Sequence, residues 1–155
     1  NLYGPNDNFD PMNSHVLPAM IRRFHEAKVR QMQGEDVEVV LWGSGKALRE
    51  FLHVDDVARA SLHLMEGGFT GLYNVGAGSE LTIRELAELI ARIVGFEGAL
   101  KWDTTKSDGT PRKLMDSSRV RETGWAPAIG LEEGIRATYE WYRAQTPPLA
   151  TVAGG

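Results

Sequence analysis

Apolar residues that recur at three- and four-residue steps predict the helices of this chain. The clearest stripe follows Thr82 and consists of Ile83, Leu86, Ala87, Ile90, Ile93 and Val94. Thr82 and Glu85 have the spacing of a capping box, and Gly95 is a suitable C-terminal stop. Weaker patterns predict further helices at Ser14 to about Gln33, Asp55 to Glu66 with Asp55 and Asp56 as caps, Ser117 to Thr123, and Leu131 to Ala144. The residues expected on one face are, in the first of these helices, Val16, Ala19, Met20, Phe24 and Ala27, and in the last, Ile135, Thr138, Tyr139 and Tyr142.

Short apolar runs predict strands between these helices. We expect strands at Val37–Trp42, Arg49–Val54, Leu72–Val75 and Ala99–Trp102. The segments 1–8 and 103–113 are rich in turn-forming residues, so we expect irregular structure there. The pattern predicts a mixed α/β protein without the regular strand–helix alternation of a complete doubly wound sheet.

Two glycine pairs follow expected strands, at Gly43-Ser44-Gly45 and Gly76-Ala77-Gly78. Each is only a piece of the Gly-x-Gly-x-x-Gly pattern that cradles a dinucleotide, so we interpret both as strand-ending turns. The sequence therefore contains no complete phosphate-binding loop for a cofactor.

Composition narrows the functional classes. The chain has 155 residues, 42% of them hydrophobic and 25% charged, as expected of one globular domain. It has no cysteine, which excludes disulfides, thiolate zinc sites and a cysteine nucleophile within it. The net charge of -4 gives no electrostatic case for nucleic-acid binding, and the four histidines have no metal-ligand spacing.

No apolar run approaches the roughly 18 residues of a membrane span. Since residue 1 is Asn rather than Met, we expect a truncated or processed chain.

A set of short motifs adds a family resemblance. In chain order they are NLYGP at 1–5, NSHV at 13–16, RRFHEA at 22–27, WGSG at 42–45, REFLHVDDV at 49–57, YNVG at 73–76, SDGTPRK at 107–113 and GWAP at 124–127. Together they resemble the C-terminal half of the extended short-chain dehydrogenase/reductases that act on nucleotide sugars, and within these the GDP-L-fucose synthase family. The resemblance implies a C-terminal nucleotide-sugar-binding part at residues 1–145, a flexible tail at 146–155, and the absence of most of the Rossmann half.

The resemblance also implies a reaction. Members of that family convert GDP-4-keto-6-deoxy-D-mannose to GDP-L-fucose by 3,5-epimerisation and NADPH-dependent 4-reduction. Their cofactor loop, the Ser, Tyr and Lys of the reduction and the cysteine of the epimerisation lie upstream of the segment that matches Asn1, so this chain alone is expected to be inactive. The whole enzyme is expected to be a cytoplasmic homodimer that binds a GDP-sugar, and neither nucleic acid nor a membrane.

His15 is the main catalytic candidate. Epimerisation beside a ketone needs a group that returns a proton, and an imidazole titrates in the required range. The resemblance assigns His15 the acid role and places it, with Asn1 and Leu2, beside the nicotinamide. The alternative from the residues alone is that His15 caps or steadies the start of the first helix. We interpret His25, His53 and His63 as structural or surface residues.

Three residues are the main candidates for binding the nucleotide end of the substrate. The guanidinium groups of Arg23 and Arg49 can pair with diphosphate oxygens, and Trp42 can pack on a base or sugar face. Their structural alternatives are a solvated helix arginine, a surface ion pair of Arg49 with Glu50, and a core tryptophan. The resemblance places all three in the GDP-sugar pocket.

The polar loop at 106–113 supplies further substrate-binding candidates, namely Lys106, Asp108, Arg112 and Lys113. The alternative is an ordinary solvated loop. For Asp55 and Asp56 we expect capping and helix-dipole roles rather than paired catalytic carboxylates, and for Trp125 and Pro127 packing and helix termination after Gly124.

Two other functions stay open at this point. One is a different nucleotide-sugar epimerase, dehydratase or reductase of the same superfamily. The other is a non-enzymatic nucleotide-sugar-binding or assembly module, which an encoded start codon directly before Asn1 would support.

Overall fold

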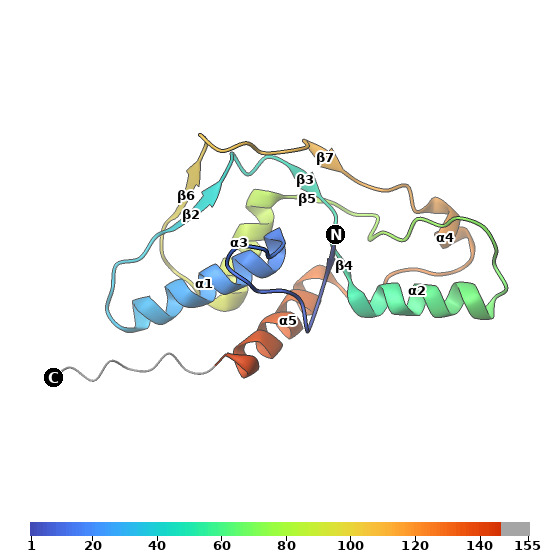
Figure 1. Ribbon diagram of the computed structural model, residues 1–155, viewed down its shortest axis with the longest axis horizontal. Coiled ribbons are helices and arrows are strands. Elements are labelled where there is room, and N and C mark those ends of the chain that lie inside the picture. The colour runs from blue at the N-terminus through green and yellow to red at the C-terminus, as the bar shows by residue number, and fades with distance from the viewer. Residues whose placement is uncertain (147–155) are drawn as a thin grey trace.

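A computed structural model describes residues 1–146, and the helices in this part of the chain form two groups (Figure 1). The larger group contains α1 (Val16–Met32), α3 (Ile83–Val94) and α5 (Leu131–Gln145). The smaller group contains α2 (Val54–Glu66) and α4 (Ser118–Glu122). In Figure 1 the N-terminus lies between the two groups, and no described helix is both long and apolar enough to cross a membrane.

The main core lies between α1, α3 and α5. The predicted faces of α3 and α5 are confirmed: Leu86, Ala87, Ile90 and Val94 are buried, as are Ile135, Thr138, Tyr139 and Tyr142. The capping box of α3 is present, since the Thr82 hydroxyl accepts from the Glu85 N–H at 3.1 Å and the Glu85 carboxylate accepts from the Thr82 N–H at 2.7 Å. Periodicity alone missed Leu17 and Ile21 of α1, which are also buried.

The strands are short and form three small sheets. Parallel pairs join β1 (Leu2–Tyr3) to β4 (Leu52–His53) and β2 (Val39–Trp42) to β6 (Leu100–Asp103). The third sheet has the order β5-β3-β7, with β3 (Leu48–Arg49) between β5 (Leu81–Thr82) and β7 (Arg112–Lys113). The strands β3 and β4 connect the two helix groups, because they follow one another directly in the chain.

Several predicted boundaries are wrong. The expected strand Arg49–Val54 is divided into β3 and β4, and β1 and β7 lie in segments predicted to be irregular. The expected strand Leu72–Val75 is absent, because the Leu72 carbonyl accepts from the Arg119 guanidinium at 2.7 Å instead of from a neighbouring strand. Of the predicted tail, Thr146 is hydrogen-bonded to the Tyr142 carbonyl, and residues 147–155 lie outside the described residues.

A second, smaller core joins α2 to α4. Leu52, Ala60, Val120 and Trp125 form it, so the packing role predicted for Trp125 is confirmed. The predicted caps of α2 are wrong: the N-cap is His53, whose Nδ1 accepts from the Asp55 N–H at 3.2 Å. Asp55 and Asp56 therefore fall in the first turn, where their charge interacts favourably with the helix dipole.

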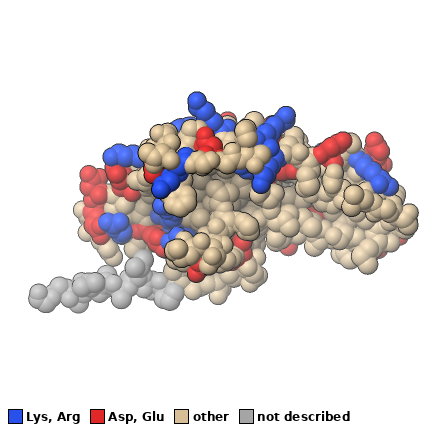
Figure 2. Space-filling view, turned by 45° about the horizontal axis from the view of Figure 1, so that its top comes forward, with Lys and Arg blue, Asp and Glu red and all other residues tan. Residues whose placement is uncertain are grey.

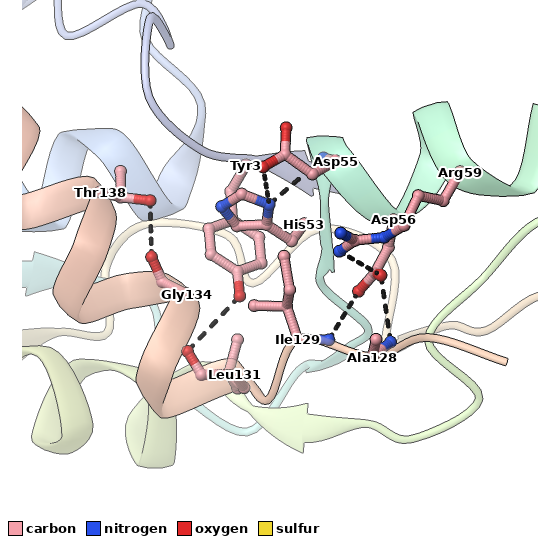
Figure 3. A network of polar contacts seen from close by, with 10 residues as sticks. All are labelled: Tyr3, His53, Asp55, Asp56, Arg59, Ala128, Ile129, Leu131, Gly134 and Thr138. Carbon is pink, nitrogen blue, oxygen red and sulfur yellow. Dashed lines mark hydrogen bonds and ion pairs between the residues drawn. The ribbon is translucent and has the colours of Figure 1, made fainter.

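Buried polar groups connect these elements (Figure 3). The Tyr3 ring meets His53 edge-on at 5.4 Å, and its hydroxyl donates to the Leu131 carbonyl at 3.4 Å. Asp56 accepts from the N–H groups of Ala128 and Ile129, each at 3.0 Å, and from Arg59 at 3.0 Å. Asp56 thereby fixes the segment that leads into α5 against α2.

The Asp56 carboxylate makes stability dependent on pH. Burial opposes its ionisation, but the two N–H groups and the Arg59 guanidinium outweigh that effect, so the pKa of Asp56 lies below its ordinary value. A folded-state pKa below the unfolded one stabilises the protein at neutral pH. That contribution is lost as the pH falls below about 4, through the folded-state pKa.

We expect Asp56→Ala to lower the free energy of unfolding by about 2–4 kcal/mol at pH 7, because it removes three hydrogen bonds to a buried carboxylate and leaves a void in its place. Urea denaturation between pH 7 and pH 3 measures the loss, and the difference from the unchanged protein should shrink at the acid end. The matched control Asp55→Ala should cost less than about 1 kcal/mol. Equal losses in the two variants would contradict the assigned role of Asp56.

Candidate functional site

Three adjoining cavities follow the start of α1, and Val16 lines all of them. Their volumes are about 650, 390 and 200 Å³. Trp42 and Ile83 line both of the smaller cavities. The three hollows therefore adjoin one another at Val16, and we name them together the α1 groove, with the His15 cavity as one end and the Arg49 cavity as the other.

The largest cavity brings together the residues predicted to lie beside a nicotinamide. Asn1, Leu2 and His15 line it, with Tyr3 and Phe51. His15 is exposed and occupies the N-cap position of α1, but its side chain makes no cap hydrogen bond. His15 therefore stands at the start of the helix, as the structural alternative predicts, but it does not cap the helix through its side chain, and it lines the cavity.

Two contacts hold this end of the groove in place. The side-chain amide of Asn1 donates to the Glu50 carbonyl at 2.9 Å. The Tyr3 hydroxyl is committed to the Leu131 carbonyl, and burial together with the charges of Asp56 and Glu133 raises the pKa of Tyr3. Tyr3 is consequently a poor proton donor to a ligand. His15 supplies the imidazole in the lining of this cavity.

The middle cavity contains Arg23 and Trp42, together with apolar side chains from α1 and β2. Trp42 is 68% exposed, so the alternative of a core tryptophan is wrong. The outward position follows from β2, in which Val39 and Leu41 are buried and Val40 and Trp42 alternate to the other face. The Lys106 ammonium lies 5.7 Å from the centre of the Trp42 ring, which places a cation beside an available aromatic face.

The smallest cavity contains Arg49, Ser107 and Asp108. Arg49 donates to the Leu48 carbonyl at 2.7 Å and makes no ion pair with Glu50. The Glu50 carboxylate instead accepts from the Met115 N–H at 2.8 Å and the Gly78 N–H at 3.3 Å. The alternative of an Arg49–Glu50 ion pair is therefore wrong.

The remaining loop candidates do not line this groove, although Lys113 is the register partner of Arg49 in the β3–β7 pair. Arg112 pairs with Glu80 at 2.8 Å and lines a separate open hollow with Leu114, Met115 and Asp116. Lys113 is exposed and lines none of the described cavities. The structure thus brings Arg23, Trp42, Arg49, Lys106 and Asp108 together and leaves Arg112 and Lys113 outside.

Cationic side chains gather around the edge of a hollow in Figure 2. Arg22, Arg23 and Arg49 are the cations that line the two smaller cavities. Arg22 already pairs with Glu26 at 2.8 Å, whereas Arg23 and Arg49 have no carboxylate partner among the described residues. This end of the groove is therefore suited to an anion.

Sequence reasoning missed two residues that organise the site. Glu50 was considered only as an ion-pair partner, and its role depends on contacts 28 and 65 residues away along the chain. Ser44 was interpreted as part of a turn, yet its N–H and hydroxyl both donate to Asp108. The glycines on each side of Ser44 were the available signal, since a small-residue loop permits such a close approach.

Comparison with known proteins shows a likeness to one family. Residues 1–76, just under half of the chain, match the NAD dependent epimerase/dehydratase family. The chain is therefore similar to that family over this part of its length, and its fold is mixed α/β.

The individual relatives are more specific. The chain is 60% identical over 144 residues to GDP-L-fucose synthase 1 of Arabidopsis thaliana, which covers 92% of this chain and 43% of that enzyme. It is 50% identical over 152 residues to GDP-L-fucose synthase of Escherichia coli strain K12, covering 92% and 46%. A GDP-L-fucose synthetase from Naegleria fowleri, solved with NADP bound, matches with a TM-score of 0.80 at 30% identity over 93% of this chain and 44% of that one. The chain spans less than half the length of these relatives.

The exposure of Trp42 leads to a stability test. We expect Trp42→Ala to change the free energy of unfolding by less than about 1 kcal/mol, because little apolar surface is buried there. Trp125→Ala in the second core should cost about 3–5 kcal/mol. Urea denaturation of both variants measures the difference. A large loss for Trp42→Ala would show that Trp42 supports the fold instead of offering its face to a ligand.

Proposed function

We propose that this chain is the nucleotide-sugar-binding part of a GDP-L-fucose synthase, and that the whole enzyme converts GDP-4-keto-6-deoxy-D-mannose to GDP-L-fucose. The observation that carries the proposal is the α1 groove, which joins a cationic end at Arg23 and Arg49 to an imidazole at His15. The extent of identity to named synthases supports the same assignment. As the family resemblance implies, we extend the proposal to a cytoplasmic homodimer.

The cationic end suits a nucleoside diphosphate. Guanidinium groups form charge-assisted hydrogen bonds with phosphate oxygens, and Arg23 and Arg49 approach the groove from α1 and β3. The exposed ring of Trp42 lies between them in the lining and offers a surface for a base or sugar ring. The diphosphate would therefore lie near Trp42, with the sugar directed toward His15.

The cavity at the His15 end suits the nicotinamide part of NADPH but not its phosphates. The cavity of about 650 Å³ is lined by apolar groups together with the polar residues Asn1, Asn6, Asp7 and His15, and its lining among the described residues includes no Lys or Arg. Asn1, Leu2 and His15 would hold the ring, and the phosphates would need donors from outside this cavity. When bound, NADPH supplies the hydride for reduction at C4. In our proposal His15 returns protons at C3 and C5, and the nucleotide end keeps the sugar beside it.

The nucleotide end is tested by calorimetry with GDP-mannose. We expect Arg49→Ala to weaken binding about 10- to 100-fold, because charge-assisted hydrogen bonds to a phosphate are lost. Arg92→Ala is the matched control, since Arg92 pairs with Glu132 on the surface of the main helix group and is absent from the groove. Equal affinity of Arg49→Ala and the unchanged chain would remove Arg49 from the site.

The His15 end is tested in the full-length enzyme. His15→Asn keeps similar size and some hydrogen bonding but lacks an imidazole that can give and take a proton. Solvent-deuterium incorporation at C3 and C5, followed by mass spectrometry, should fall about 10²–10⁴-fold, the usual contribution of general acid–base catalysis. His63→Asn is the control, because His63 contacts Thr123 beside the second core. Unchanged exchange in a folded His15→Asn enzyme would show that another group supplies the proton.

A further inference from the structure

The segment between β1 and α1 forms a wall that two cavities of the α1 groove share. In Figure 1 it is the dark-blue trace between these two elements. Its first part, residues 4–7, lines the largest cavity. Further along the segment, Pro11, Met12 and Ser14 line the middle cavity. We call residues 4–14 the groove wall, since its position determines the shape of both hollows.

Hydrogen bonds give the groove wall its turns. The Asp10 carboxylate accepts from the N–H groups of Met12 and Asn13, each at 2.9 Å. The Asp10 carbonyl accepts from the Ser14 N–H at 3.2 Å. In the described part of the chain, the partners in all hydrogen bonds of residues 6–14 lie within the wall itself. These bonds therefore shape the wall but do not attach it to α1 or α5.

One aromatic side chain attaches the middle of the groove wall to α5. The Phe9 ring stacks on Trp141 with 6.1 Å between the ring centres, and its centre lies 4.5 Å from that of Tyr142. Tyr142 is buried in the main core, and Phe9 is half-buried against that core. Phe9 lines none of the described cavities, so it anchors the wall from the side away from a ligand.

We propose that Phe9 is a positioning residue: by stacking on α5, it holds the groove wall in the place that a nucleotide sugar needs. This inference rests on the proposed nucleotide-sugar function. A wall that is in place for only a fraction of the time lowers the apparent affinity by that fraction. Loss of the anchor therefore weakens binding although no group that lines the groove is removed.

Three roles of Phe9 predict different results for GDP-mannose binding. A ring that touches the ligand makes the affinity depend on Phe9 and not on Trp141. A ring that only stabilises the core leaves the affinity of the folded chain unchanged. A positioning ring predicts that Phe9→Ala and Trp141→Ala both weaken binding, although Trp141 lies on α5 and lines none of the described cavities.

The decisive experiment is a double-mutant cycle measured by calorimetry with this chain and GDP-mannose. We expect about 5- to 20-fold weaker binding for Phe9→Ala, about 3-fold for Trp141→Ala, and no further loss when Trp141→Ala is added to Phe9→Ala. Phe9→Tyr should keep the affinity within about 2-fold, because an aromatic ring remains in the stack. Additive losses, or unchanged affinity in either alanine variant, would overturn the inference.

Phe69→Ala is the matched control. Phe69 follows α2, where its ring stacks on His63 at 5.7 Å and meets Tyr73 edge-on at 6.4 Å. It lines none of the described cavities, and its removal should change the affinity less than about 2-fold, because distant sites act independently. A loss as large as that of Phe9→Ala would show that removal of any aromatic pair weakens binding, which contradicts a specific anchor.

A second measurement separates this inference from the proposed function. Hydrogen exchange at the Met12 and Asn13 amides reports the groove wall without any ligand. We expect exchange about 10-fold faster in Phe9→Ala than in Phe69→Ala, because turns with few buried contacts open easily once the anchor is lost. Equal exchange in the two variants would overturn the inference even if binding weakens. Absence of GDP-mannose binding by the unchanged chain, with fast exchange in Phe9→Ala, would instead overturn the proposed function.

Discussion

A carboxylate that folding removes from water needs hydrogen-bond donors, and the arrangement of this protein depends on how Glu50 meets that requirement. The residue is 3% exposed, and its donors are the backbone N–H groups of Gly78 and Met115. Both belong to connecting segments that are distant from β3 in sequence. Because the buried Glu50 carboxylate needs these two donors, it fixes the path of both segments over β3.

The same residue determines how the two ends of the groove are spaced. Arg49 precedes Glu50 and lines the cationic end, while Phe51 follows it and lines the cavity at His15. The Glu50 carbonyl accepts from Asn1, which brings the first residue of the chain to β4. Gly76 belongs to this arrangement too, because a Cβ there would lie 2.7 Å from the Glu50 carboxylate. Asp56 repeats the principle in the second helix group, where its oxygens fix Ala128 and Ile129.

Sequence reasoning succeeded where the determining contacts are local. The Thr82–Glu85 capping box and the buried face of α5 depend on residues three or four positions apart, so the pattern contains them. It failed where a side chain outside the local pattern determines the backbone conformation. Leu72–Val75 has the composition of a strand, but the Leu72 carbonyl accepts a hydrogen bond from Arg119. At the start of α2 the Asp55 N–H donates to His53, so neither predicted aspartate is the N-cap.

The candidate site shows the same division. Chemistry-bearing residues were found from their type and from the family resemblance, since Arg23, Trp42, Arg49 and His15 all line the groove. What each is free to do was not predictable, because it depends on partners elsewhere in the fold. Arg112 pairs with Glu80 and Asp108 with Ser44, and neither partner is a sequence neighbour. Side-chain type and the resemblance thus predicted residues that line the groove, and the tertiary contacts show which of the candidates already have a partner in the fold.

The distribution of charge along the groove limits the chemistry that this chain contributes under the proposed function. Its cations are at the nucleotide end, where a diphosphate gains from permanent guanidinium charges that do not titrate. The lining at the other end contains neither Lys nor Arg in the described residues, and its tyrosine hydroxyl is committed to the Leu131 carbonyl. His15 supplies the imidazole in this lining. Under the proposed function, binding energy is supplied at one end of the groove and proton transfer by His15 at the other, so holding the nucleotide is what would keep the sugar within reach of His15.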